Sequence, residues 1–440
     1  MSNDTIGCRG CDEYAALSRR GFLGAAGAVS FAAMAAPAWL PRVSLARDYR
    51  GSQRDVMISI FLRGAADGLS MCVPFSEPNY YNLRPTVAVP QPDSGQVGAC
   101  TDLGVAVNGP NGPTGFGLPP GMLALLPAFQ AGNLLFVHAA GSHDPTRSHF
   151  DGQRFMEVGK ARDISLISGW LGRHLMSTPP ADPESLLRAV GINPSLQRTL
   201  VGGPLTLPVP NLDTFGLTAT ASTIPQRSAA IHDMYEATAE PLHSVGLNTL
   251  STIDLLNTIN FAGYAPAGGA TYPANAFGTA MKSSAALIKA QVGVEAIAID
   301  LGGWDTHDAQ GTTAGVMHNL MTTLSTALAA FNTDLTTGIN PTYSLVCMSE
   351  FGRRAAQNGS NGTDHGHGNV MLVMGNAIHG GRVLTQWPGL NPGQLYQNLD
   401  LAVTIDYRDV LAEIAAERLG NTNLPFLFPD YTPTFRGVLL

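Results

Sequence analysis

Short apolar runs separated by glycine-rich loops set the pattern of the chain. Five runs of strand length lie at residues 56–62, 134–140, 296–301, 344–348 and 370–374. Segments of helix length lie between or after these runs, at residues 122–130, 313–334 and 408–419. Strands that alternate with helices are typical of an α/β fold. The pattern therefore predicts a mostly parallel central sheet flanked by helices on both faces.

The stretch from about 204 to 273 departs from this pattern. It contains irregular polar and helical pieces and no obvious strand, so we expect a helical or irregular insertion. Segments rich in proline and glycine at residues 90–120 and 387–393 predict surface loops. Together these features predict one α/β domain over about residues 50–436 that carries the insertion.

The N-terminus has the three parts of an export signal. The pair Arg19 and Arg20 precedes a soft apolar run at residues 24–40, and the small residues Ser44 and Ala46 follow and fit a peptidase pocket. The run is rich in glycine and alanine and contains a proline, so a permanent membrane span is not expected. We expect residues 1–46 to be a twin-arginine signal peptide. The twin-arginine translocase would then deliver the folded protein to the periplasm or the exterior.

Composition and charge narrow the functional classes. The chain has 440 residues, 45% of them apolar and 13% charged, which is enough for one large α/β domain or two modest ones. Its formal net charge is −8. Because binding to a phosphate backbone needs clustered lysine and arginine, a nucleic-acid partner is not expected.

The five cysteines predict at most one disulfide in the mature chain. Cys8 and Cys11 lie in the segment that would be removed with the signal. An oxidising compartment favours a bond between Cys72 and Cys100. Cys347 lies in an apolar run and is expected to be a small buried hydrophobic residue.

Side chains that carry chemistry gather in loops after the predicted strands, where open α/β sheets bind their ligands. Asp67 follows the first strand in a glycine-flanked loop that would let a cation or phosphate approach the backbone. The alternative is a turn aspartate that caps its own loop.

The loop at residues 143–150 joins a predicted strand to a predicted helix. Thr146 and Ser148 are candidate alkoxide nucleophiles at the helix N-terminus, and His149 is a further catalytic candidate. Arg147 could hold a phosphate or sulfate group through a bidentate pair. Helix capping by the two hydroxyls is the alternative.

Two further loops are rich in carboxylates and imidazoles. Residues 300–308 contain three aspartates and a histidine, Asp305 and His307 among them, which would destabilise one another without a cation or hydrogen-bond donors. Asp364 and His365 are adjacent and flanked by glycines, so both side chains can turn toward one ion. Glu350 precedes them near the same edge. A solvated loop without metal is the alternative in both cases.

The sequence Thr363-Asp364-His365-Gly366 resembles the Ser/Thr-Asp-His-Gly motif of the alkaline phosphatase-like superfamily, whose adjacent Asp and His are metal ligands. The chain is also similar to a bacterial family within it, the domain of unknown function 1501 family. The segments that carry this similarity are residues 61–69, 80–85, 146–151, 169–173, 302–307, 349–353 and 362–368.

The resemblance implies an alkaline phosphatase-like fold and a set of metal ligands. By position, Asp67 would be the first-strand ligand, and Asp364 and His365 would complete its site. Asp305 and His307 would belong to a second site. Relatives usually separate this second Asp and His by three residues, whereas here only one intervenes. One of the two could therefore lie outside the first layer of ligands, or the site could hold a single ion.

The remaining ligand and the nucleophile stay open. His367 or His379 could supply a further ligand. Sulfatases place their nucleophile two residues before a Pro-Ser-Arg, and that position is His143 here. This departure weakens a sulfatase assignment and leaves Thr146 and Ser148 as candidates.

These observations predict an exported, metal-dependent, hydrolase-like protein that acts on small phosphate or sulfate esters. Mixed Asp and His ligands favour Zn or Mn over Mg or Ca. The main alternative is a non-catalytic exported protein of the same fold that recognises an anionic ligand, a glycan or a partner protein. A structural or assembly role is a third possibility.

Overall fold

Apolar side chains alternate along the strand β1 (Val56–Leu62) and divide the core into two layers. Ile58 and Ile60 belong to one apolar cluster, and Met57 and Phe61 belong to the other. Because successive side chains of a strand point to opposite faces, β1 is covered on both. The computed structural model describes residues 54–218, 220, 222–338 and 342–440. The predicted signal peptide, with Cys8 and Cys11, lies outside the described residues.

A nine-stranded sheet forms the centre of the molecule. Its other strands are β4 (Leu134–Gly141), β5 (Ala189–Ile192), β6 (Thr206–Pro208), β7 (Ala296–Leu301), β8 (Tyr343–Ser349), β9 (Asn369–Gly375), β10 (Arg382–Leu384) and β11 (Ile405–Asp406). Their order is β10-β4-β9-β8-β1-β7-β5-β6, and β11 pairs with β4. Only the two pairings of β9, with β4 and β8, are antiparallel. The prediction of a mostly parallel sheet is confirmed.

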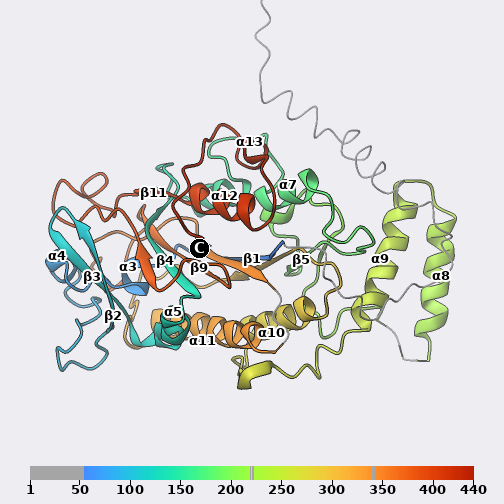
Figure 1. The fold of residues 1–440 in the computed structure, drawn as a ribbon, viewed down its shortest axis with the longest axis horizontal. Coiled ribbons are helices and arrows are strands. Elements are labelled where there is room, and N and C mark those ends of the chain that lie inside the picture. Colours follow the sequence, from blue (N-terminus) through green and yellow to red (C-terminus); the bar gives the residue numbers. More distant parts are fainter. Residues whose placement is uncertain (1–53, 219, 221, 339–341) are drawn as a thin grey trace, which may run out of the picture.

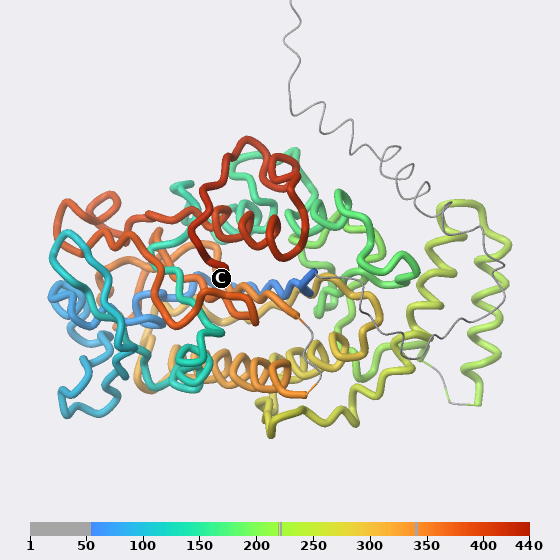
Figure 2. The backbone as a smooth tube through the Cα atoms, viewed as in Figure 1, coloured from blue at the N-terminus to red at the C-terminus, as the bar shows by residue number. Residues whose placement is uncertain are grey.

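Helices cover both faces of this sheet (Figure 1). On one face lie α10 (Ala276–Lys289) and α11 (Val316–Thr336), which share a core cluster with β1. On the other lie α7 (Trp170–Ser177), α12 (Tyr407–Glu417) and α13 (Leu424–Leu427). Figure 2 shows the same three layers, with β1 between the C-terminal helices and α11. The predicted α/β class is confirmed.

Several shorter elements complete the chain. The predicted helix at 122–130 is split into a 3-10 turn, Pro120–Leu125, and a short helix α5 (Leu126–Gln130). The remaining helices near the first strands are α3 (Gly68–Met71), α4 (Pro78–Leu83) and α6 (His149–Val158). Two short 3-10 turns lie at Arg198–Leu200 and Ala267–Gly269. In the part of the chain that the structure describes, no helix is long and apolar enough to cross a membrane.

Two segments differ from the sequence-based expectation. The segment at 90–120, expected to be surface loop, contains an antiparallel hairpin of β2 (Thr101–Gly109) and β3 (Gly112–Leu118). The segment at 204–273 begins with β6, which pairs with β5 at the edge of the sheet. Its helices α8 (Ile224–Glu236) and α9 (Leu242–Asn257) stand at one end of the molecule (Figure 1). Glycines in the hairpin and the three-residue length of β6 hide the strand pattern.

The expected disulfide between Cys72 and Cys100 is not formed. Both residues are free and buried, as is Cys347. Burial raises the pKa of Cys100 to about 12, and burial also raises the pKa of Cys72. Since the thiolate is the form that reacts, both thiols are poorly placed to oxidise. The expectation that Cys347 is a buried small hydrophobic residue is confirmed.

The sheet topology brings the predicted chemistry to one edge. Strands β1, β4, β7 and β8 run in the same direction, so the loops that follow them leave the same carboxyl edge. The loop that leads into antiparallel β9 returns to this edge. Loops of distant sequence therefore meet there, as ligand sites of open α/β sheets require.

Candidate metal centre

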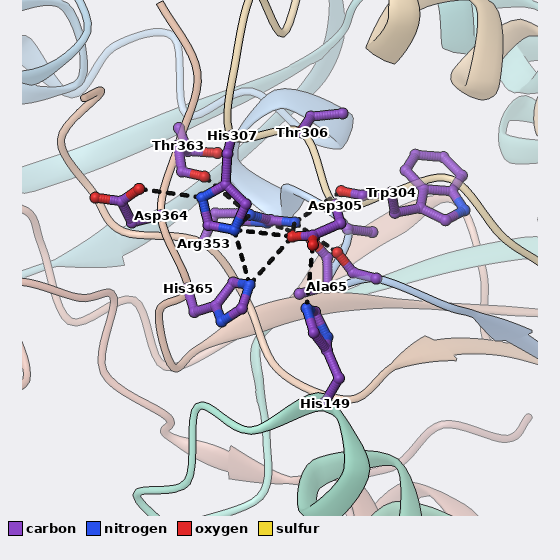
Figure 3. A network of polar contacts seen from close by, with 12 residues as sticks. Ala65, His149, Trp304, Asp305, Thr306, His307, Arg353, Thr363, Asp364 and His365 are labelled. Atoms are coloured by element: carbon purple, nitrogen blue, oxygen red, sulfur yellow. Dashed lines mark hydrogen bonds and ion pairs between the residues drawn. The ribbon is translucent and has the colours of Figure 1, made fainter. Parts of the chain in front are cut away.

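Three imidazoles converge on one carboxylate at this edge (Figure 3). His149 is the first residue of α6, Asp305 and His307 follow β7, and His365 precedes β9. We call these four residues the histidine cluster. The Nε2 atoms of His307 and His365 lie 2.9 and 3.1 Å from Asp305 Oδ1. His149 Nε2 lies 3.4 Å from Asp305 Oδ2. Four potential ligands thus face one another.

The three ring Nδ1 atoms each meet an oxygen on the outer side of the cluster. His149 Nδ1 lies 2.8 Å from Glu350 Oε1. His365 Nδ1 lies 2.9 Å from the carbonyl oxygen of Arg147, and His307 Nδ1 lies 3.1 Å from Asp364 Oδ1. Carbonyls and ionised carboxylates only accept hydrogen bonds, so each Nδ1 is the donor. In a neutral imidazole this leaves the lone pair on Nε2, directed into the cluster.

The inner side of the cluster therefore has more acceptors than donors. Arg353 donates to Asp305 Oδ1 at 2.7 Å, but His149 Nε2 is buried and has no hydrogen-bond partner among the described residues. The Nε2 atoms of His307 and His365 are only 2.9 Å apart. Lone pairs at this separation repel unless a proton or a cation lies between them. The donor set of imidazole nitrogens and one carboxylate fits a transition metal ion.

One group of side chains among the described residues has the spacing of a metal site. It consists of His149, Asp305 and His365, whose ligand atoms all lie within 4.8 Å of one another. His307 lies beside this group. The side chains of Asp305 and His307 are 47% and 42% exposed, so solvent reaches the cluster. Catalytic metal sites keep such an open position, whereas structural sites are closed.

Hydrogen bonds keep the carboxylates of the site ionised. Burial opposes ionisation of Glu350, but donors from His149 and Gln153 lower its pKa to about 2. Burial also opposes ionisation of Asp305, but the hydrogen bond from Arg353 is the first cause that lowers its pKa to about 2. The hydrogen bond to Glu350 is the main cause of a raised pKa at His149. The site therefore carries negative charge that attracts a cation.

Arg353 fixes the loops that carry the cluster. Its side chain is fully buried and donates to the backbone carbonyls of Gly64, Trp304 and Thr363. These carbonyls belong to the loops after β1 and β7 and before β9. The same guanidinium holds Asp305, so this arginine positions the carboxylate and is not free to bind an anion.

Asp67, implied by the resemblance as the first-strand ligand, does not join the histidine cluster. It is 1% exposed, and Arg84 binds its two oxygens at 2.6 and 3.0 Å. Ser70 and Gln310 also donate to it. Burial opposes ionisation of Asp67, but Arg84 outweighs it and lowers the pKa of the carboxyl. The structure thus places Asp67 in a buried ion pair. Gln310 connects this pair to the loops of the cluster, since it accepts from Thr306 and Thr363.

Asp364 lies on the outer side of His307. Its Oδ1 accepts from His307 Nδ1 and from Asn358 Nδ2, both at 3.1 Å. The Asn358 hydrogen bond is the first cause of a lowered pKa at Asp364. In this structure Asp364 therefore orients His307, while its neighbour His365 faces the centre. The two residues were expected to turn toward one ion together.

The catalytic candidates at the start of α6 make hydrogen bonds and ion pairs that hold the loop and the helix in place. Ser148 is the N-cap of α6 and accepts from the backbone of Asp151. Thr146 Oγ1 accepts from the backbone of Ser148 at 3.2 Å. Arg147 pairs with Asp400 and donates to Gln397 at 3.0 Å. The capping alternative is confirmed for Ser148.

The two further ligand candidates lie outside the group of three. His367 is buried and stacks on Tyr396 with ring centroids 4.1 Å apart, and burial lowers its pKa to about 4. His379 is exposed and follows β9. His149 was predicted as a catalytic candidate and not as a possible ligand, because its position depends on the contact with Glu350, which lies 201 residues away in sequence.

Comparison with known proteins supports the family resemblance but assigns no activity to the family. The model of the family described as "Protein of unknown function (DUF1501)" matches residues 224–425. This region contains Asp305, His307, Glu350, Asp364 and His365 but not His149. No curated protein matches the chain.

Proposed function

We propose that the protein is an exported metal-dependent hydrolase acting on phosphate or sulfate esters, with His149, Asp305 and His365 as its metal ligands. The observation that carries this proposal is the convergence of three imidazole Nε2 atoms on Asp305, with His149 Nε2 buried and without a hydrogen bond among the described residues. Export rests on the twin-arginine sequence at the N-terminus.

The nature of the ligands favours Zn or Mn. Imidazole nitrogen suits these ions, whereas Mg and Ca prefer oxygen ligands alone. His149, Asp305 and His365 would hold a divalent ion, which would supply Lewis-acid chemistry for activating water and polarising an ester oxygen. Glu350 and the carbonyl of Arg147 fix the ring orientations of His149 and His365.

His307 is the side chain best placed to accept a proton. Its Nε2 lies at the centre, its ring is 42% exposed, and Asp364 holds its Nδ1. This arrangement of a histidine oriented by a carboxylate is typical of a general base. Since Ser148 caps α6 and Thr146 accepts from the backbone, we propose that water, not a hydroxyl of the chain, is the nucleophile.

Hydrolysis of aryl phosphate and aryl sulfate by the mature protein tests this function. We expect activity that is lost on chelation, returns with Zn or Mn, and is abolished by His307→Ala. His232→Ala on α8 is the matched control, since His232 is exposed and, among the residues that the structure describes, pairs only with neighbours on its own helix. An absence of hydrolysis of either ester after loading with each metal would reject the hydrolase.

One observation favours the alternative of a non-catalytic exported binding protein. Arg147, the residue expected to hold an anionic substrate, pairs with Asp400, and Arg353 is committed to carbonyls and Asp305. An intact metal centre without any ester hydrolysis would support this second function, in which the metal itself recognises an anionic ligand.

A further inference from the structure

A cavity of about 450 Å³ lies beside the histidine cluster, along the same helix α6. His149 begins this helix, and Gln153, one turn later, lines the cavity. Gln153 donates to Glu350 Oε1 at 3.0 Å, the same atom that holds His149. Since four helical residues span about 6 Å, one small ligand can reach from the cavity to the cluster.

Fixed polar groups line part of this cavity. Arg63 donates to both oxygens of Glu157 at 2.9 Å and to Asp300 Oδ1 at 3.1 Å. Asn193 donates to Asp300 Oδ2 at 2.9 Å. The network holds planar donors and acceptors in place, and two carboxylates face one guanidinium. Arg154 and Arg198 also line the cavity, so its wall carries guanidinium donors as well as carboxylate acceptors. Hydroxyls, which can both donate and accept, match such a mixed set.

Apolar side chains line another part of the cavity. Phe150 is 89% exposed and Ile167 is 52% exposed, although both are large hydrophobic residues. An exposed aromatic ring at a cavity offers a flat surface for an apolar ligand face. Gln197 also lines the cavity, and its buried Oε1 has no hydrogen-bond partner among the described residues.

We propose that this cavity binds a neutral sugar ring. A sugar presents hydroxyls at its edge and C–H groups on its face, which match the polar network and Phe150. Resting on the proposed function, this inference makes the substrate a sugar phosphate or sugar sulfate. The ester would lie at the histidine cluster and the ring in the cavity.

Equilibrium binding to the metal-loaded mature protein, followed by ligand-observed NMR, tests the proposal. The probes are the methyl glycosides of glucose, galactose, mannose and N-acetylglucosamine, with inorganic phosphate and sulfate in parallel. We expect at least one glycoside to saturate, and Phe150→Ala to weaken its binding by about fivefold to tenfold. Phe435→Ala removes an exposed ring that does not line the cavity, and it should leave binding unchanged.

The two proposals fail in different ways. Glycoside binding that persists in His307→Ala, together with an absence of ester hydrolysis in the unaltered protein, would support the cavity and reject the hydrolase. The sugar site is overturned if no glycoside saturates, or if Phe150→Ala binds as well as Phe435→Ala. It is also overturned if only phosphate or sulfate binds and Arg198→Ala abolishes that binding, because Arg198 lines the cavity as well.

Discussion

Glu350 accepts a hydrogen bond from His149 Nδ1 at 2.8 Å, and this bond directs the opposite nitrogen of the ring toward Asp305. The two residues lie 201 positions apart in sequence, on the loop after β8 and at the start of α6. A carboxylate behind a metal-binding histidine fixes its tautomer and increases its basicity. The contact is therefore the outer support of the proposed metal centre.

Glu350→Gln tests this support while keeping the shape of the side chain. We expect the affinity for Zn to fall by about tenfold to a hundredfold, because a neutral amide holds His149 less strongly. Competition with a chromophoric chelator measures the affinity. Glu417→Gln, an exposed substitution on α12, is the control. Equal affinities in the two variants would show that Glu350 does not support a ligand.

Asp67→Asn tests whether Asp67 stabilises the fold through its ion pair or binds metal, as the resemblance implies. Removing one charge of a buried pair leaves Arg84 uncompensated, which costs about 3–5 kcal/mol. We expect the free energy of unfolding in urea to fall by about this amount, while the folded variant keeps its metal. A variant of unchanged stability that has lost its metal would instead identify Asp67 as a ligand.

The sequence predicted those parts of the fold that depend on long local patterns. Strands such as β1 and β8 are continuous apolar runs, which only a sheet buried on both faces explains well. Shorter strands were missed, since β5 has four residues and β6 has three. Such strands owe their conformation to neighbours in the sheet, and no local period reveals them.

Only those parts of the candidate site that local sequence reveals were predicted. Asp305, His307 and His365 were identified from residue type and from their place after or before a strand. The ion pair of Asp67 with Arg84 was not predicted, because Arg84 lies on a separate segment and only the fold brings the two side chains together. The direction of each imidazole likewise depends on contacts between distant loops, which local spacing does not contain.

Ser148→Ala tests whether the hydroxyl at the start of α6 is a nucleophile. Loss of the N-cap should lower the free energy of unfolding by about 1 kcal/mol, while ester hydrolysis continues near the rate of the unaltered protein. Urea denaturation and a turnover assay measure the two effects. Complete loss of turnover in a stable, metal-loaded variant would restore the alkoxide mechanism.

His138 makes stability depend on pH. Its Nε2 donates to the carbonyl of Cys72 at 3.0 Å and its Nδ1 accepts from the backbone of Ala139 at 2.8 Å, so the ring is neutral. Burial lowers the pKa of His138 to about 4, below the ordinary value of 6.5. The unfolded chain therefore binds a proton that the folded chain does not bind. The contribution to stability is complete above about pH 6.5 and decreases as the pH falls toward 4.

Unfolding free energies at several pH values between these limits measure the effect. We expect His138 to contribute a slope of about 1.4 kcal/mol per pH unit. Burial also lowers the pKa of His174, to about 3, and the pKa of His367, to about 4, so a slope remains in His138→Gln but is smaller. Identical slopes in the variant and the unaltered protein would contradict a neutral buried His138.

Elemental analysis of the mature protein after exposure to Zn or Mn and removal of free ions tests the central claim most directly. The account predicts about one equivalent of metal per chain. That metal should be lost in Asp305→Ala and His365→Ala and kept in His232→Ala. A protein that retains no metal, or an Asp305→Ala or His365→Ala variant that retains as much as the His232→Ala control, would contradict it.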